Sequence, residues 1–227
     1  GQKLDHPATM EEVIKYGGLD WEVETKPLMT NEDPPSPAPM RVAIVRKDRE
    51  PGKRRVLGVT HPGFKPLQNK TGIRVFDSIF GKGKGVYHTG GYLGNGEVIW
   101  ALARLPKTLE VTRKDKVNTY ALFTNSHNGS IAIDIRLTTV RVVCQNTLSL
   151  ALKKKTKTIF KHAHQGNYSD LQSQVEMFFE ETLKAADHIG ITFKEMLRRK
   201  FDDDQVKAYV ETLFPLPRRK PESRSEE

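Results

Sequence analysis

Apolar and polar residues alternate most regularly between residues 131 and 138 of the chain. The apolar members recur at every second position and are Ile131, Ile133, Ile135 and Leu137. The polar or small members between them are Ala132, Asp134, Arg136 and Thr138. Because successive side chains of a strand point to opposite faces, this pattern predicts a half-buried strand with one covered apolar face.

A second apolar run follows this strand and contains a charged residue. Val140, Val142 and Val143 surround Arg141. A buried guanidinium needs a carboxylate or carbonyl partner, so Arg141 is either a half-buried, paired residue or a strand residue that faces solvent. Asn146 or Thr147 can cap the helix that the pattern predicts over about residues 147–155.

Several other stretches have the pattern of strands bounded by turn residues. Residues 41–47 and 54–61 predict a hairpin around Pro51 and Gly52. Residues 87–93 and 97–105 predict a second hairpin around residues 94–96 (Gly-Asn-Gly), and residues 117–124 predict a further strand.

Helix start signals occur at both ends of the chain. Residues 9–12 form a capping box before a short helix that ends at Gly17. Asn69 can cap a helix over residues 70–80, whose buried side contains Ile73, Phe76, Ile79 and Phe80. Helices are also predicted to begin near residues 169, 192 and 202, and the last of them ends before Pro215.

These elements predict an α+β fold in which helices pack on a twisted antiparallel sheet, followed by a C-terminal helical segment. Residues 1–40 hold the first helix and a proline-rich, extended connector over residues 30–40. Residues 41–165 form the α+β core, residues 166–214 the C-terminal helices, and residues 215–227 a polar tail. The chain begins at Gly1, so whether it is excised from a longer protein is open.

The composition of the chain limits the compartment and the partners that we expect for the protein. The only cysteine is Cys144, which excludes an internal disulfide and fits a reducing cytoplasm. No apolar run has the length of roughly 20 residues that a membrane helix needs, so no membrane partner is expected. The net charge of +9 favours a polyanionic partner, and a homo-oligomer is an open alternative to a monomer.

Positive charge is concentrated in two segments. Residues 41–65 contain eight Lys or Arg against two acidic residues, and residues 141–161 contain six and no acidic residue. If the two segments converge, they form a nucleic-acid-binding surface; otherwise they are separate solvated loops. The candidate contact residues are Arg46, Lys47, Arg54, Arg55, Lys65, Lys153, Lys154 and Lys155.

Two polar motifs supply further candidate residues. Residues 125–130 (Asn-Ser-His-Asn-Gly-Ser) predict a hairpin turn with a positive φ at Gly129, or else an exposed polar site at His127 and Asn128. Residues 64–69 (Phe-Lys-Pro-Leu-Gln-Asn) lead into a helix, and Gln68 and Asn69 could donate to phosphates while Phe64 stacks on a base. With Arg141, the polar residues Gln68, Asn69, His127 and Asn128 form the candidate polar site.

No pattern in the chain indicates enzymatic machinery, a metal or a cofactor. The glycine-rich residues 81–85 follow a predicted helix, whereas a phosphate-binding loop precedes one. His162 and His164 lack the companions of a zinc site. A nucleophilic Cys144 with His127 and Asn146 can be drawn, but a cysteine that follows two valines favours a small buried side chain.

Four motifs together resemble one known family. They are residues 64–69, residues 90–100 (Gly-Gly-Tyr-Leu-Gly-Asn-Gly-Glu-Val-Ile-Trp), residues 125–130 and residues 136–148 (Arg-Leu-Thr-Thr-Val-Arg-Val-Val-Cys-Gln-Asn-Thr-Leu). Over about residues 19–162 the chain resembles the phage/plasmid-like proteins of the domain of unknown function 932. It departs from them at Asn128, where Asp is frequent, and at Thr139, where Pro is frequent. The resemblance implies a mobile genetic element, a bacterial cytoplasm and no established activity.

The order of elements also resembles that of phage and eukaryotic single-strand annealing proteins, in which a basic hairpin leads into a helix and further antiparallel strands. This resemblance and the charge favour a non-catalytic module that binds or anneals single-stranded DNA or RNA. The alternative is an adaptor or anti-defence protein that binds another protein through its acidic C-terminal helices and binds no nucleic acid. A nuclease is disfavoured, because Asp115 and Asp134 form no recognisable metal-binding set.

Overall fold

Two antiparallel sheets form the framework of the α+β fold in the computed structural model of the 227-residue chain. The structure describes residues 2–48, 55–80, 86–110, 116–152, 158–179 and 202–213, together with Glu195 and Arg198. The large sheet has six strands in the order β1-β5-β6-β7-β8-β9. They are Gln2–Ala8 (β1), Val86–Leu93 (β5), Val98–Glu110 (β6), Lys116–Ser126 (β7), Ile133–Thr138 (β8) and Thr158–His162 (β9). The four strands predicted between residues 87 and 138 are confirmed as β5 to β8.

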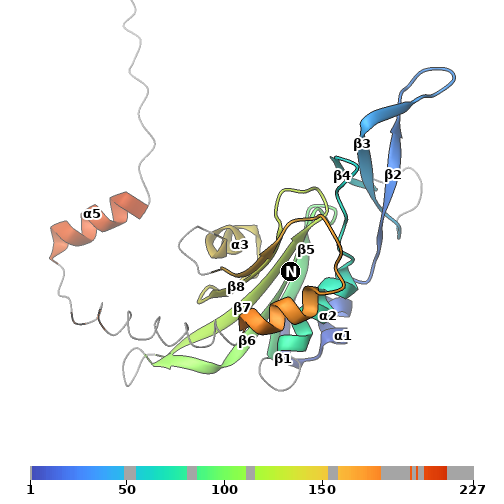
Figure 1. Ribbon diagram of the computed structural model, residues 1–227. Coiled ribbons are helices and arrows are strands. Elements are labelled where there is room, and N and C mark those ends of the chain that lie inside the picture. Colours follow the sequence, from blue (N-terminus) through green and yellow to red (C-terminus); the bar gives the residue numbers. More distant parts are fainter. Residues whose placement is uncertain are drawn as a thin grey trace, which may run out of the picture.

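The small sheet has three strands in the order β2-β3-β4. They are Val23–Met29 (β2), Pro37–Arg46 (β3) and Val56–Thr60 (β4). The predicted pairing of residues 41–47 with residues 54–61 is confirmed, whereas the predicted turn at Pro51 lies outside the described residues. In Figure 1 the hairpin of β2 and β3 extends away from the large sheet.

The predicted connector over residues 30–40 is wrong in its second half. Residues 37–40 are the first residues of β3, and Pro37 pairs with Met29 across the hairpin. A proline is tolerated at the first position of a strand, where the amide hydrogen bond that it lacks is least needed. Proline content therefore misled the prediction.

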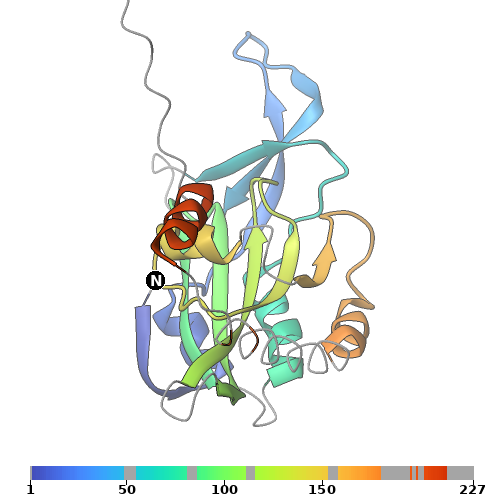
Figure 2. The same cartoon turned by 90° about the vertical axis from the view of Figure 1, so that its left-hand side faces the viewer.

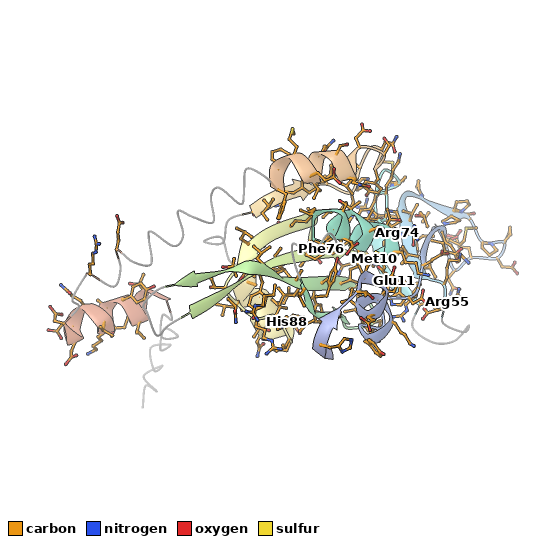
Figure 3. All side chains as sticks on the ribbon, turned by 90° about the horizontal axis from the view of Figure 1, so that it is seen from below. Met10, Glu11, Arg55, Arg74, Phe76 and His88 are labelled. Atoms are coloured by element: carbon orange, nitrogen blue, oxygen red, sulfur yellow. The ribbon has the colours of Figure 1, made fainter. Side chains whose placement is uncertain are left out.

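Helices cover both faces of the large sheet. One face packs against α1 (Met10–Tyr16), α2 (Asn69–Phe80) and the helical residues 171–179, while α3 (Gln145–Ala151) covers the other (Figure 2). In Figure 3, Phe76 lies on the α2 side of the strands and His88 on the α3 side. Phe76 is fully buried and stacks on Phe123 of β7 at a centroid distance of 5.8 Å.

The predicted helix starts at residues 9 and 202 are confirmed, whereas α3 begins after Cys144 and not after the predicted Asn146 or Thr147. The capping box of α1 is formed, with Thr9 Oγ1 accepting from the Glu12 amide and Glu12 accepting from the Thr9 amide. At the other end of the chain, Asp202 Oδ1 accepts from the Gln205 amide and begins α5 (Asp203–Leu213). Where its side chains are described, α5 is exposed.

Strand β8 is buried on both faces, so the expectation of one open polar face is wrong. Its apolar side chains join the core under α2, and its polar side chains lie under α3. Arg136 and Asp134 form a bidentate ion pair with two distances of 2.6 Å, and Arg136 Nη1 donates to the Leu152 carbonyl at 3.1 Å. Pairing makes this buried charge tolerable, because each charged group is hydrogen-bonded. Alternation alone does not show that a helix covers the second face.

Two residues after β8 differ from expectation. Arg141 is half-buried, but its Nε and Nη2 atoms have no hydrogen-bond partner among the described residues, so the predicted partner is not found there. Cys144 is exposed instead of buried, because it is the residue that precedes α3. Its Sγ lies 3.5 Å from Thr147 Oγ1, and hydrogen bonds from the Thr147 backbone and hydroxyl lower the pKa of the thiol.

Replacing Ile133 tests the register of β8. Ile133 is 1% exposed and faces the core under α2. Ile133→Asp should lower the free energy of unfolding by about 3 kcal/mol or more, because an unpaired carboxylate would be buried. Ile133→Val should cost only about 1 kcal/mol. Denaturant unfolding measures both, and an Ile133→Asp protein as stable as the Val variant would contradict this register.

Candidate functional site

The two sheets meet where β4 packs against the turn between β7 and β8. Gly58 of β4 lies so close to this turn that a Cβ atom at position 58 would be 2.6 Å from the Cα atom of Asn128. Such a distance leaves no room for a side chain, so a glycine is needed for the strands to approach. Gly129 adopts the predicted positive φ of +76°, and the interpretation of residues 125–130 as a hairpin turn is confirmed.

The side chain of Asn69 connects three separate segments beneath this turn. It is 1% exposed, and its Nδ2 donates to the carbonyls of Leu19 at 3.1 Å and Trp21 at 3.2 Å. Its Oδ1 lies 2.8 Å from Nε2 of His127, which must be the donor because an amide oxygen only accepts. Asn69 is therefore an internal connection and not the helix cap or phosphate ligand that the sequence suggests.

Gln68 has a similar role next to Asn69. Its side-chain oxygen accepts from the Val23 amide at 3.0 Å, and its nitrogen donates to the Val23 carbonyl at 2.8 Å. These two hydrogen bonds pair the Gln68 side chain with the backbone at the start of β2, as a neighbouring strand would. The amide group is fully used inside the protein, and Gln68 is not positioned as a free donor.

His127 is fully buried, so the expectation that it is exposed is wrong. Burial lowers the pKa of His127 to about 3, and the positive charges of His164 and Arg46 act in the same direction. The imidazole is therefore neutral at neutral pH and contacts the Trp21 ring at a centroid distance of 5.3 Å. A neutral, enclosed ring stabilises the junction and is not available as a phosphate ligand.

Arg46, a predicted nucleic-acid contact, lies inside the junction as well. Its side chain is 7% exposed and forms a bidentate pair with Asp48 at 2.6 and 2.8 Å. Nη1 donates to the Asn95 carbonyl at 2.8 Å, and the guanidinium lies 4.1 Å from the centroid of the Trp21 ring. These contacts satisfy the buried cation, which is thereby removed from the surface.

The remaining predicted cations divide into three groups. Lys47 and Arg55 are near carboxylates, since Lys47 Nζ is 2.7 Å from Glu22 and Arg55 Nη2 is 4.0 Å from Glu24. Lys65 is exposed and has no ion pair within the described part of the chain. The other four lie outside the described residues, and they are Arg54, Lys153, Lys154 and Lys155.

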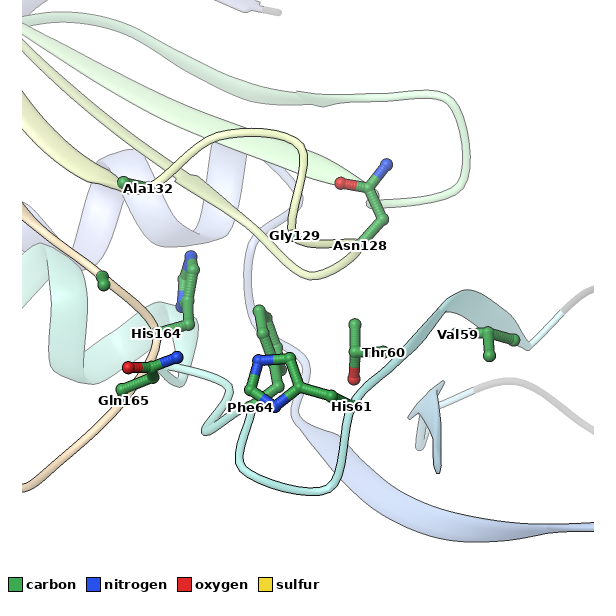
Figure 4. A pocket seen from close by; sticks show the side chains of 10 residues that line it. Val59, Thr60, His61, Phe64, Asn128, Gly129, Ala132, His164 and Gln165 are labelled. Atoms are coloured by element: carbon green, nitrogen blue, oxygen red, sulfur yellow. The ribbon is translucent and has the colours of Figure 1, made fainter. Parts of the chain in front are cut away.

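A pocket of about 370 Å³ opens beside this junction and is called the junction pocket below. Three segments line it: the end of β4 with the turn after it, the β7–β8 turn, and the residues after β9 (Figure 4). Its lining residues are Val59, Thr60, His61, Phe64, Asn128, Gly129, Ala132, Ala163, His164 and Gln165. Of these, Asn128 was a candidate site residue and Phe64 a candidate for stacking on a base; Asn128 is partly exposed and Phe64 is buried.

The inner wall of the junction pocket is aromatic. The rings of Phe64 and His164 have centroids 4.6 Å apart and an interplanar angle of 32°. Nε2 of His164 donates to the Ile131 carbonyl at 3.1 Å. Burial lowers the pKa of His164, although the carbonyls of Ile131 and Lys65 favour the protonated ring. Thr60 Oγ1 and His164 Nδ1 have no hydrogen-bond partner among the described residues.

Sequence reasoning missed most of this pocket for an identifiable reason. His164 and Gln165 follow β9, a strand of five residues that comes directly after a lysine-rich segment and was not predicted. Thr60 and His61 were placed at a strand end, but nothing in the sequence showed that residues 163–165 would lie against them. The pocket is a product of tertiary packing.

The described residues contain no group of three or more His, Cys, Asp or Glu side chains that could hold a metal ion. Among the same residues, no helix is long and apolar enough to cross a membrane. The chemistry that the junction pocket offers is therefore that of aromatic rings, amides and a hydroxyl.

Fold and pocket define an α+β domain with two antiparallel sheets and a neutral pocket where they meet. The family model described as a domain of unknown function (DUF932) matches residues 56–227. This match covers most of the chain, which therefore belongs to the DUF932 family. No curated protein and no solved structure matches the chain.

The buried imidazole of His127 should make the protein sensitive to acid. Its pKa is about 3 in the folded protein and about 6.5 in an unfolded chain, so the unfolded state binds more protons between these values. Stability is therefore complete above about pH 6.5 and declines as the pH falls toward 3. Between pH 7 and pH 5, this single residue should account for about 2 kcal/mol of lost free energy of unfolding.

Comparison with His127→Gln isolates this contribution. Glutamine retains a donor for Asn69 Oδ1 but does not titrate, and the effect of His164 is common to both proteins. Denaturant unfolding at pH 7 and pH 5 should show a smaller loss in the variant. Equal losses in the two proteins would show that His127 is not the buried neutral group described above.

Proposed function

We propose that this protein is a non-catalytic module that binds or anneals single-stranded nucleic acid. The proposal rests on one observation: the two longest carboxylate-free stretches of the chain, residues 51–76 and 135–169, come together at the junction pocket. They contain six and seven Lys or Arg residues respectively, more positive charge than the net +9 of the whole chain.

Direct contacts join the two stretches. The Lys65 amide donates to the His164 carbonyl at 2.9 Å, and the Tyr168 hydroxyl donates to the Lys65 carbonyl. The contact between the tilted rings of Phe64 and His164 completes the connection. Lys65 therefore stands at the point where the stretches meet, with its side chain in solvent.

Not every cation of the two stretches is available to a ligand. Lys70 is 2.7 Å from Asp20, and Arg136 is paired with Asp134 under α3. Lys65, Arg74 and Lys161 are exposed and form no ion pair within the described part of the chain. Exposed cations that form no ion pair with the described carboxylates suit a polyanion, because phosphates meet little competition for them.

A single strand fits better than a duplex. Proteins that bind single strands combine a basic path for the backbone with planar side chains for the bases. The junction pocket places Phe64, His164 and His61 beside Lys65, which is that combination. The setting on phages or plasmids and in the bacterial cytoplasm, implied by the family resemblance, is consistent with a role in recombination.

The proposal predicts binding that weakens steeply with salt. Each phosphate contact with a single strand contributes a slope of about −0.7 to a plot of log affinity against log salt concentration. Replacing Lys153, Lys154 and Lys155 with alanine should therefore weaken binding and reduce the magnitude of the slope by about 2. Fluorescence anisotropy of a labelled oligonucleotide at several salt concentrations measures both quantities.

A matched control removes the same charge elsewhere. Lys15, Lys26 and Lys207 are exposed and lie outside both carboxylate-free stretches, so their triple alanine variant should retain the slope of the unmodified protein. Equal losses in the two triple variants would mean that net charge alone drives binding. Absence of binding at low salt would overturn the proposal and favour a protein partner.

A further inference from the structure

We infer that the junction pocket holds one unstacked base of the bound strand. This inference rests on the proposed function, since it concerns the same ligand, but it adds a site for the base to a surface for the backbone. A surface of lysines alone would bind phosphates and be indifferent to whether bases are present. If the pocket holds a base, that base contributes directly to the affinity of the protein for the strand.

The lining of the junction pocket suits an uncharged, planar group. None of its ten residues is Lys, Arg, Asp or Glu, so a phosphate or carboxylate would find no charged partner inside. Its volume of about 370 Å³ lies at the lower end of the range of about 300–1,000 Å³ that is usual for small-molecule pockets. A nucleobase is flat and neutral, and it is small enough to enter a pocket of this volume.

Aromatic rings stand where a base would stack. Phe64 and His164 are nearly buried and form the inner wall, whereas His61 is exposed at the rim. Figure 4 shows these three side chains gathered below the turn that carries Gly129. A base that enters between the inner wall and the His61 ring is in contact with planar groups, as in other single-strand sites.

Polar atoms without partners lie in the same wall. Thr60 and His164 are 9% and 5% exposed, and Thr60 Oγ1 and His164 Nδ1 have no hydrogen-bond partner among the described residues. Because Nε2 of His164 donates to the Ile131 carbonyl, Nδ1 of the neutral ring is an acceptor. Because both atoms are enclosed by the protein, stacking on the rings and not hydrogen bonding would hold the base, which leaves the site without selection for one base.

Gly129 keeps the mouth of the pocket open. Its φ is +76°, and a Cβ atom there would lie 3.7 Å from Cε2 of Phe64 and 3.8 Å from Cγ2 of Thr60. Any larger side chain at this position would extend over two lining residues. Lys65 is exposed and adjacent in the chain to Phe64, so its ammonium group is available to a phosphate of the same strand.

The first experiment compares two strands with the unmodified protein. A short labelled oligothymidylate is tested against a strand of equal length in which every nucleotide lacks its base. The thymidylate should bind about tenfold more tightly, within the range given by stacking one base on aromatic side chains. The baseless strand should still bind at low salt and show the same salt slope, because its phosphates are unchanged.

The second experiment fills the pocket. Asparagine tolerates a positive φ better than other residues with side chains, so Gly129→Asn should fold while its amide occupies the mouth. Gly166→Asn is a matched control, since Gly166 has a φ of +77° and a Cβ atom there would meet nothing within 4 Å. Gly129→Asn should reduce thymidylate binding to the level of the baseless strand, and Gly166→Asn should leave it unchanged.

The outcomes separate this inference from the proposed function. If neither strand binds at low salt, the nucleic-acid function itself is wrong. If both strands bind equally tightly, the protein binds backbone only and the base site is wrong. Should Gly129→Asn melt at a much lower temperature than Gly166→Asn, Ala163→Trp replaces it, because Ala163 is exposed and lines the same pocket.

Discussion

The side chain of Asn69 makes the contacts on which the arrangement of the two sheets depends. Through one amide group it holds the carbonyls of Leu19 and Trp21, which precede β2, and the imidazole of His127, which follows β7. All three partners are distant from Asn69 in sequence, and the amide is buried, so each lost contact would leave a polar group unsatisfied. The segment before β2, helix α2 and the turn after β7 are therefore joined by this residue.

The sequence predicted the central strands well because their apolar residues alternate, as Ile133, Ile135 and Leu137 of β8 show, although the polar face of β8 is buried as well. It did not predict β1, β2 or β9. Strand β2 contains Lys26 and Pro27 and is mostly exposed, so hydrophobic alternation is weak there. Strand β1 is defined by its partner β5, which is remote in the chain, whereas β2 and β9 pair with the neighbouring strands β3 and β8.

The candidate site was harder to predict, because residue type does not determine whether a polar group faces solvent. Arg46 and Lys47 are neighbours in the sequence, yet Arg46 is enclosed by Trp21 and Asp48 while Lys47 is half exposed. Lys47 is the residue after β3, and only the packing at the end of this strand shows that Arg46 is inside. The sequence did show which stretches of the chain lack carboxylates. This information describes the charge of the surface and not the packing of individual side chains.

The β2–β3 hairpin has a firm base and an exposed end. Near its base, Val23 is held by Gln68, and Ile44 and Val45 are buried, whereas Met29 and Met40 beyond β4 are largely exposed. A two-stranded ribbon without a third strand is easily twisted about its long axis. The exposed outer part of this hairpin therefore adds little to the buried core, and substitutions at its tip should leave the junction below it intact.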